Sequence, residues 1–127
     1  MDREGFGYSL GLMETVGLKI EKDPTSTKDV LIYRLDGKLA IENVSDFMQK
    51  MRQETSSSLI LDMGGVNFLD SAGVGTLVSL FVSQRNHDKR FGLASLTKQG
   101  LAVIQVSGLH KLLPIFDNVE QALIAKV

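Results

Sequence analysis

The sequence predicts a single α/β domain built on a mixed sheet of four to five strands with about four helices. A short apolar run at residues 59–63 has the length and composition of a buried central strand. Apolar residues recur with a helical period on both sides of this run, over residues 41–53 and 72–86. A helix that connects two apolar strands implies that the strands pair in parallel. A chain of 127 residues suits one domain with one core.

The N-terminal part of the chain predicts two antiparallel strands. Apolar and charged residues alternate over residues 18–21, as in a half-buried strand. Residues 23–26 have the composition of a turn, and a second apolar strand follows at residues 30–35. We expect this second strand to end at the Asp36-Gly37 pair.

Residues 1–16 predict a flexible N-terminal extension, because their large apolar residues are scattered and follow no clear period. The domain itself is then expected over residues 17–127. In the alternative interpretation, Leu10, Leu12 and Met13 dock on the domain or on a partner.

The elements beyond the second strand follow from the same patterns. The helix expected at 41–53 has one apolar face, made of Val44, Phe47, Met48 and Met51. After the strand at 59–63, two glycines indicate a loop, and the helix at 72–86 follows. Another strand is expected at 91–96 and a short helix at 99–106, and a last helix is marked by Val119, Ala122 and Leu123.

Composition and charge argue against several classes of partner. Fourteen basic and fifteen acidic residues leave no net field that attracts nucleic acid, and the basic residues form no stripe. The chain has no cysteine, which excludes disulfides and thiolate metal sites. The N-terminus lacks a basic region followed by a long apolar run, so we expect no secretory signal. The apolar runs are much shorter than the roughly 20 residues that span a bilayer. We therefore expect a soluble cytoplasmic protein without nucleic-acid or membrane partners.

The most informative segment lies where the central strand passes through the glycine-rich loop to the helix that opens at Asp70-Ser71. In open α/β sheets, ligand and partner sites lie beyond the carboxyl ends of parallel strands. On a helical wheel, one face of this helix is expected to pack on the core: Val74, Leu77, Val78, Phe81 and Val82. The opposite face carries Ala72, Gly73, Thr76, Ser79, Leu80 and Ser83.

No charged residue occurs from Ser71 to Gln84, although solvated helix faces normally carry Lys and Glu. A small, uncharged face lets another backbone come close, so we interpret it as a contact surface for a partner protein. In the alternative interpretation, the rest of this domain buries the helix on both sides.

Ser71 stands at the start of this helix, where either Ser71 or Asp70 is expected to serve as N-cap. The first-turn N–H groups lack partners within the helix, and the dipole is positive there. A phosphate on Ser71 would therefore be tolerated by its own helix, while about two negative charges would stand beside the uncharged face. A partner surface that fits the unmodified serine would then be opposed by the charge and the volume of the phosphate.

The segment Asp70-Ser71-Ala72-Gly73-Val74-Gly75, with Leu61-Asp62-Met63 before it, resembles the signature of anti-sigma factor antagonists in the STAS superfamily. The resemblance extends from about residue 17 to the C-terminus and includes the segments 35–39, 106–109 and 113–116.

This resemblance implies a switch without catalytic residues of its own. The unphosphorylated antagonist binds an anti-sigma factor with serine kinase activity and so frees a sigma factor. The kinase then phosphorylates Ser71 and the complex falls apart, and a PP2C-type phosphatase resets the switch. ATP and magnesium belong to the partner, so this chain holds no cofactor. The partner contacts that the resemblance implies are the start of the helix and two residues nearby: Asp70, Ser71, Ala72, Gly73, Asp36 and Gly37. The uncharged face of the helix adds Thr76, Ser79 and Leu80 to the expected contacts.

An enzyme is disfavoured by the residues themselves. His87 lies 16 residues after Ser71, at roughly 24 Å along an unbroken helix, which is too far for a general base. His110 reads as a surface or packing residue. The glycines at 64–75 lack the Gly-Lys-Ser/Thr ending of a phosphate-binding loop, and Asp62 and Asp70 are too isolated for a metal site. The serious alternative is a STAS scaffold, or a subunit of a transport complex, that has no phosphoswitch.

Overall fold

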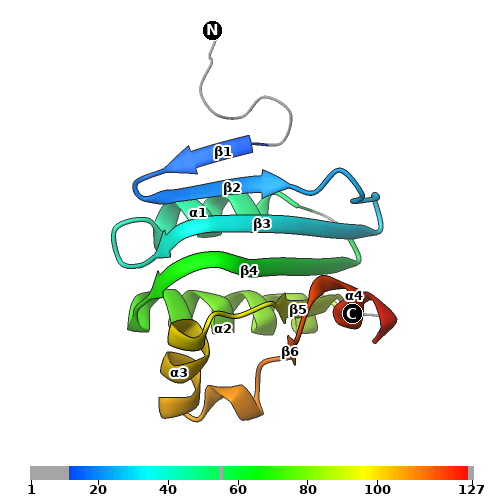
Figure 1. The fold of residues 1–127 in the computed structure, drawn as a ribbon. Helices are drawn as coiled ribbons and strands as arrows, with labels where there is room; N and C mark the ends of the chain where they lie inside the picture. Colours follow the sequence, from blue (N-terminus) through cyan, green and yellow to red (C-terminus); the bar gives the residue numbers. More distant parts are fainter. Residues whose placement is uncertain (1–11, 55, 126–127) are drawn as a thin grey trace, which may run out of the picture.

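The computed structural model of this chain describes residues 12–54 and 56–125, which form one six-stranded sheet with helices on both of its faces (Figure 1). In chain order the elements are β1 (Leu12–Thr15), β2 (Leu18–Lys22), β3 (Val30–Leu39), α1 (Val44–Arg52), β4 (Ser58–Leu69), α2 (Ser71–Asn86), β5 (Arg90–Ala94), α3 (Lys98–Val106), the 3₁₀ helix η2 (Leu109–Lys111), β6 (Ile115–Phe116) and α4 (Val119–Ile124).

The sheet is mixed, and its strands follow one another in sequence order from β1 to β6. The β1, β2 and β3 strands pair antiparallel, whereas the pairs from β3 to β6 are parallel. The predicted α/β class is confirmed. The sheet has more strands than the four to five expected, because the short edge strands β1 and β6 carry too few residues to give a pattern.

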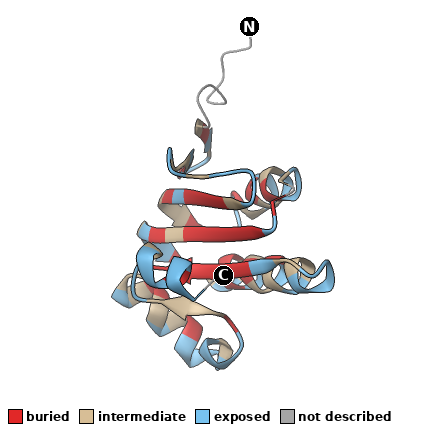
Figure 2. Ribbon diagram, turned by 90° about the vertical axis from the view of Figure 1, so that its right-hand side faces the viewer, coloured by how far each residue is buried: buried red, intermediate tan, exposed pale blue. Residues whose placement is uncertain are grey.

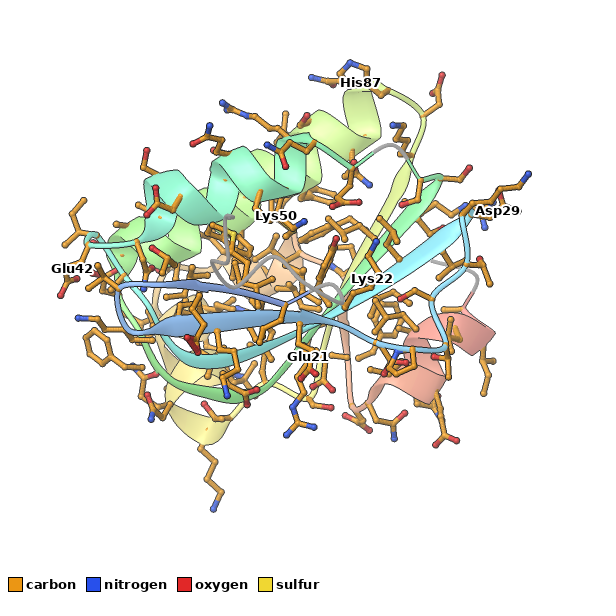
Figure 3. The ribbon with its side chains drawn as sticks, turned by 90° about the horizontal axis from the view of Figure 1, so that it is seen from above. Glu21, Lys22, Asp29, Glu42, Lys50 and His87 are labelled. Carbon is orange, nitrogen blue, oxygen red and sulfur yellow. The ribbon has the colours of Figure 1, made fainter. Side chains whose placement is uncertain are left out.

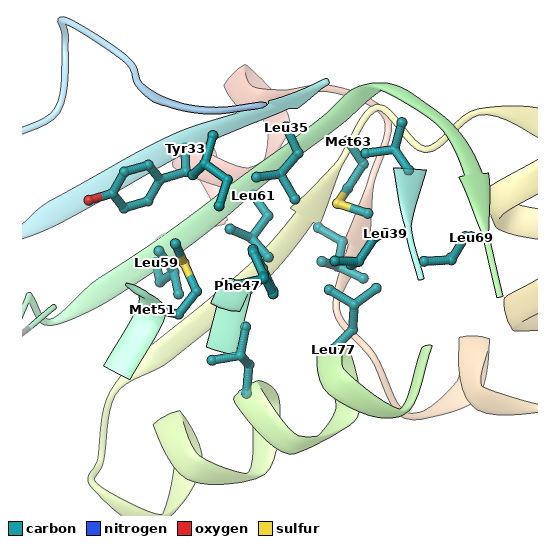
Figure 4. Close-up of a cluster of buried hydrophobic side chains, with 14 of the residues drawn as sticks. Tyr33, Leu35, Leu39, Phe47, Met51, Leu59, Leu61, Met63, Leu69 and Leu77 are labelled. Atoms are coloured by element: carbon teal, nitrogen blue, oxygen red, sulfur yellow. The ribbon is translucent and has the colours of Figure 1, made fainter. Parts of the chain in front are cut away.

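The sheet separates two unequal apolar layers. On one face, the larger cluster joins strand side chains to residues of α1, α2 and α3, such as Phe47, Leu77 and Ile104. Figure 4 shows Phe47 and Leu77 pointing toward strand residues of this layer. On the other face, α4 places Ala122 against Ile32, Ile60 and Ala94 in a smaller cluster. The central strands are consequently buried along most of their length (Figure 2).

The predicted glycine-rich loop at Gly64-Gly65 is wrong, since β4 continues as a strand to Leu69. Gly65 pairs with Asp36 of β3, and a Cβ on Gly65 would lie 1.8 Å from the Asp36 carboxylate. This glycine therefore permits close contact within the sheet and does not form a turn. The position at which the strand ends, and the helix begins, is Leu69-Asp70.

The expected end of the second strand at Asp36-Gly37 is also wrong, because β3 runs through both residues to Leu39. The register of β3 against β4 shifts on either side of this pair, as in a bulge. Gly37 has φ of 117°, and a Cβ there would lie 2.1 Å from the backbone oxygen of Gly17. A glycine at a bulge resembles a turn signal in sequence, although here it bends a continuous strand.

The predicted flexible extension over residues 1–16 is wrong for its last part. Residues 12–15 form β1, which pairs with β2 and buries Met13 to 7% exposure. The alternative of docking on the domain is thereby supported for Leu12 and Met13. Residues 1–11, which include Leu10, lie outside the described residues.

A buried amide ties the end of β3 to the start of α1. Asn43 is fully buried and precedes α1. Its Nδ2 donates to the backbone oxygens of Val16 at 2.7 Å and Lys38 at 3.0 Å, and its Oδ1 accepts from Ala40 N at 3.1 Å. The side chain of the residue that precedes α1 thus joins the β1–β2 turn to the end of β3 and the residue after it.

We expect Asn43→Ala to lower the free energy of unfolding by about 3 kcal/mol, because three backbone groups lose their partner in a buried place. Urea denaturation followed by circular dichroism measures this loss. Gln49→Ala, on the exposed face of α1, is the control and should change stability by no more than about 0.5 kcal/mol. Equal losses in the two variants would contradict the role of Asn43.

Candidate functional site

The junction of β4 and α2 is held by the Asp70 side chain. Asp70 is the N-cap of α2, and its Oδ1 accepts from Gly73 N at 2.8 Å. Its Oδ2 accepts from Ile41 N at 3.1 Å, which attaches the loop after β3 to the same residue. Of the two candidate caps, Asp70 therefore takes this role, and Ser71 is the first residue of the helix.

Ser71 is exposed, and its hydroxyl has no hydrogen-bond partner within residues 12–54 and 56–125. The hydroxyl is thus not needed to cap the helix, because the Asp70 carboxylate already does so. A group that is exposed, unbonded and fixed on the first turn of a helix is accessible to a phosphoryl donor on another protein.

The first turn of α2 packs directly on the end of β3. A Cβ on Gly73 would lie 2.2 Å from the backbone oxygen of Leu39 and 2.8 Å from the Leu69 side chain. The Asp70 N–H also points to the Leu39 oxygen, at 3.4 Å. This close packing fixes the helix on the sheet, so that Ser71 keeps one position relative to the carboxyl ends of the parallel strands.

The charges next to Ser71 are acidic. The Asp70 carboxylate lies close enough to Glu42 to act on its pKa. The pKa of Glu42 is lowered by a hydrogen bond from the Lys38 ammonium, and the Asp70 charge opposes this effect. A phosphate on Ser71 would therefore stand near the carboxylates of Asp70 and Glu42. The Lys38 ammonium is already paired with Glu42 at 2.5 Å.

The predicted division of α2 into two faces needs correction. Gly73 and Leu80, which were expected on the contact face, are buried, with Leu80 only 3% exposed. Val82, which was expected in the core, is 43% exposed. The reason is that α1 packs along one flank of α2, so the buried arc of the helix is rotated toward α1.

We define the exposed stripe as the four residues Ser71, Gly75, Ser79 and Val82, which are exposed and follow one another along one side of α2. Ala72 and Thr76 lie half-buried beside this stripe, and Thr76 donates its hydroxyl to Ala72 O at 2.9 Å. The alternative, in which the domain buries the helix on both sides, is therefore wrong for the described residues.

Gly75 and Val82 were missed by the sequence reasoning. A Cβ on Gly75 would have no heavy atom within 4 Å, so the packing of the described residues does not require a glycine there. Glycine inside a helix costs roughly 0.5–1 kcal/mol relative to alanine. A glycine inside the expected helix was the signal that the sequence offered for this position.

Asp36 and Gly37 lie in the β3 bulge, three and two residues before Leu39. At about 3.3 Å per strand residue, Asp36 is roughly 10 Å along the strand from the contact between Leu39 and Asp70. Asp36 forms an ion pair with Arg34 at 3.4 Å, and Gly37 packs on Gly17. Both residues thus have a structural role, and their contact with a partner stays a prediction.

The two histidines are not brought to Ser71. The α2 helix is unbroken to Asn86, and His87 places its Nδ1 2.8 Å from the Ser83 oxygen at the far end. Figure 3 shows Glu42 and His87 at opposite ends of the two helices. His110 lies exposed on η2. Among the described residues, no three His, Cys, Asp or Glu side chains form a group that could hold a metal ion.

No helix among the described residues is both long and apolar enough to cross a membrane. A groove of about 650 Å³ lies between α1 and α2 and is lined by Val44, Ser45, Met48, Gln49, Arg52, Gln53 and Thr76. It runs along the side of the helix and does not contain Ser71.

A strand that ends at Leu69, an aspartate cap and a small-residue helix make up the geometry of this site. The family model of the STAS domain matches residues 21–122, which is most of the chain. The chain belongs to the STAS domain family. Within this STAS domain, the matched region contains β3 to β6, α1 to α3 and most of α4, and it includes the whole junction around Ser71.

Known proteins of two kinds are similar to the chain. The anti-sigma F factor antagonist of Paenibacillus polymyxa is 26% identical over 101 residues, which are 76% of this chain and 86% of that protein. The anti-sigma factor antagonist SpoIIAA in its unphosphorylated form superposes with a TM-score of 0.69 at 21% identity, over 85% of this chain and 97% of SpoIIAA. A sulfate transporter family protein from Wolinella succinogenes gives a TM-score of 0.68 at 21% identity, over 80% and 87% of the two chains. The fold is therefore common to both kinds.

We expect Gly73 and Gly75, near the start of α2, to respond in opposite ways to alanine. Gly73→Ala should lower the free energy of unfolding by about 2 kcal/mol, because its Cβ would overlap the Leu39 oxygen. Gly75→Ala should raise it by about 0.5–1 kcal/mol, because its Cβ meets open space in a helix. Thermal and urea denaturation of the two variants measure the difference. A loss of stability in Gly75→Ala would show that this glycine has a packing role.

Proposed function

We propose that this STAS protein is an anti-sigma factor antagonist whose binding is switched off by phosphorylation of Ser71. The observation that carries the proposal is the placement of an exposed, unbonded serine at the head of an exposed stripe without charge. The unphosphorylated protein binds an anti-sigma factor that is also a serine kinase, and it thereby frees a sigma factor. The protein acts through binding and not as an enzyme.

The chemistry of the switch requires only a hydroxyl from this chain. The Ser71 Oγ attacks the γ-phosphorus of ATP in the partner, so that an O–P bond forms and ADP leaves. The hydroxyl proton passes to a base of the partner, and ATP and magnesium are held by the partner. A PP2C-type phosphatase then hydrolyses the phosphoserine and restores the binding form.

Phosphorylation would change binding through charge more than through a change of fold. A phosphoserine carries roughly two negative charges at neutral pH, and Asp70 and Glu42 stand beside it. The partner surface that fits the exposed stripe would lie directly against these negative charges, and the interface would exclude the water that solvates them. Juxtaposed like charges, or an unpaired charge at an interface, cost several kcal/mol, which is enough to dissociate the complex.

The relatives support the same assignment. The similar protein of Paenibacillus polymyxa is named an anti-sigma F factor antagonist, and SpoIIAA is known in an unphosphorylated and a phosphorylated form. We propose that the present chain shares this pair of states. A cytoplasmic location follows from the proposal, since the proposed partners act on a transcription factor.

We expect Ser71→Ala to bind the anti-sigma kinase and Ser71→Asp to lose at least about 100-fold in affinity, because the carboxylate places charge on the stripe. The kinase is first captured from the source cell with the wild-type protein, and affinity is then measured by calorimetry. Mass spectrometry after incubation with ATP should find phosphate on Ser71 and none on Ser71→Ala.

The matched control is Ser57→Asp, which introduces the same charge at an exposed serine before β4. It should leave affinity unchanged. If Ser71→Asp binds every captured partner as well as Ser57→Asp does, the switch is refuted. A stable complex with transport or scaffold proteins, insensitive to residue 71, would then favour the alternative function.

We expect Gly75→Leu to weaken kinase binding at least tenfold, because the added side chain projects from the stripe into the space that a partner backbone would occupy. The protein should stay folded, since no heavy atom lies within 4 Å of a Cβ at this exposed position. Ala102→Leu places the same side chain at an exposed position of α3 and should bind normally. Normal binding by Gly75→Leu would remove α2 from the proposed interface.

A further inference from the structure

The end of β4 that leads to Ser71 has a neighbouring strand on one side only. β3 pairs with β4 as far as Leu69, whereas β5 pairs with β4 only over residues 58–62. Beyond Asp62, the backbone N–H and C=O groups of β4 that face the side of β5 therefore need other hydrogen-bond partners. The N-terminal turn of α3 occupies this place in the described structure.

Two side chains of α3 and its cap supply the missing hydrogen bonds. The Thr97 hydroxyl donates to Val66 O at 3.2 Å and also caps α3 by accepting from Gly100 N. The Gln99 amide makes a paired contact with Leu69, in which Oε1 accepts from Leu69 N at 3.1 Å and Nε2 donates to Leu69 O at 3.2 Å. Gln99 thus bonds both polar groups of one peptide residue, as a neighbouring strand would.

The Leu69 side chain is held as firmly as its backbone. Leu69 is 1% exposed and lies between the first turns of two helices. A Cβ on Gly73 of α2 would lie 2.8 Å from its Cδ1, and a Cβ on Gly100 of α3 would lie 3.9 Å from its Cδ2. Because Asp70 and Ser71 follow directly, the orientation of Leu69 determines where the cap and the serine stand.

We propose that Gln99 is a positioning residue for Ser71, acting through Leu69 and Asp70 without touching the partner. This inference rests on the proposed phosphorylation of Ser71. Phosphoryl transfer depends on placing the acceptor oxygen in line with the donor phosphate, and a shift of 1 Å can cost about 100-fold in rate. Of the exposed stripe, only Ser71 lies next to the segment that Gln99 holds, whereas Gly75, Ser79 and Val82 follow further along α2. We therefore expect ground-state binding to depend much less on Gln99 than phosphoryl transfer does.

The test is Gln99→Met, which keeps side-chain length and removes both hydrogen bonds to Leu69. Hydrogen exchange of the Leu69 amide, measured by NMR, should become about tenfold faster, and the amide resonances of residues 70–73 should shift. With the captured anti-sigma kinase and ATP, kcat for Ser71 phosphorylation should fall about tenfold, while KM should change less than twofold.

Two controls separate positioning from general destabilisation. Thr97→Val removes the α3 cap and the Val66 contact, and so lowers stability while the Gln99–Leu69 pair is kept. Gln105→Met makes the same substitution at an exposed position of α3. Both controls should retain the wild-type resonances at residues 70–73 and the wild-type kcat.

The inference is overturned if Gln99→Met leaves these resonances and kcat unchanged, or if Thr97→Val lowers kcat equally. If the wild-type protein accepts no phosphate from any captured kinase, the proposed function fails. The resonances and the exchange rate at Leu69 then still decide whether Gln99 sets the position of Ser71.

Discussion

The Asp70 carboxylate joins three segments that are distant in sequence. One oxygen caps α2 at Gly73, and the other accepts from Ile41 in the loop between β3 and α1. The main-chain N–H of Asp70 points at the end of β3. An apolar residue at this position would leave two backbone donors without partners, so the loop and the helix start would both loosen. This arrangement leaves the Ser71 hydroxyl without a capping role, because the Asp70 carboxylate already accepts from Gly73 N.

The α2 helix combines two surfaces with different requirements. Its buried arc carries Val74, Leu77 and Leu80 onto the sheet and α1, where apolar burial supplies the stability. Its exposed stripe lacks the charged residues and strong helix formers that a solvated surface normally carries. Gly75 lowers helix stability without a compensating contact among the described residues. Positions where a local rule is broken are commonly functional, which is consistent with the proposed contact surface.

The short β5 strand explains why α3 has a part in the site. A longer β5 would pair with β4 up to Leu69 and would leave no place for Thr97 and Gln99. Because β5 ends at Ala94, the chain turns into α3 early enough for two side chains to take over the hydrogen bonding of the sheet. The same arrangement places the first turns of α2 and α3 on either side of Leu69. Ser71 is thereby linked, through Leu69, to α3, which lies outside the proposed interface.

The sequence by itself determined the fold class, the central strand and the position of α2, because apolar periodicity records which face of each element is buried. It also singled out the Asp70-Ser71 junction, since a cap residue at a strand-to-helix boundary is a local signal. It did not separate a glycine that makes a turn from Gly37 and Gly65, which allow a bulge and close pairing inside strands. The strands β1 and β6 were missed because their stability comes from neighbours and not from their own few residues.

The tertiary structure alone decided which side of α2 is exposed. A helical wheel finds an apolar arc, but the position of α1 rotates the buried arc so that Leu80 is covered and Val82 is not. The roles of Asn43 and Gln99 also depend on partners far away in sequence, at Val16 and at Leu69. Short-range patterns carry no record of such contacts, because a buried amide acts through the backbone groups that folding brings to it.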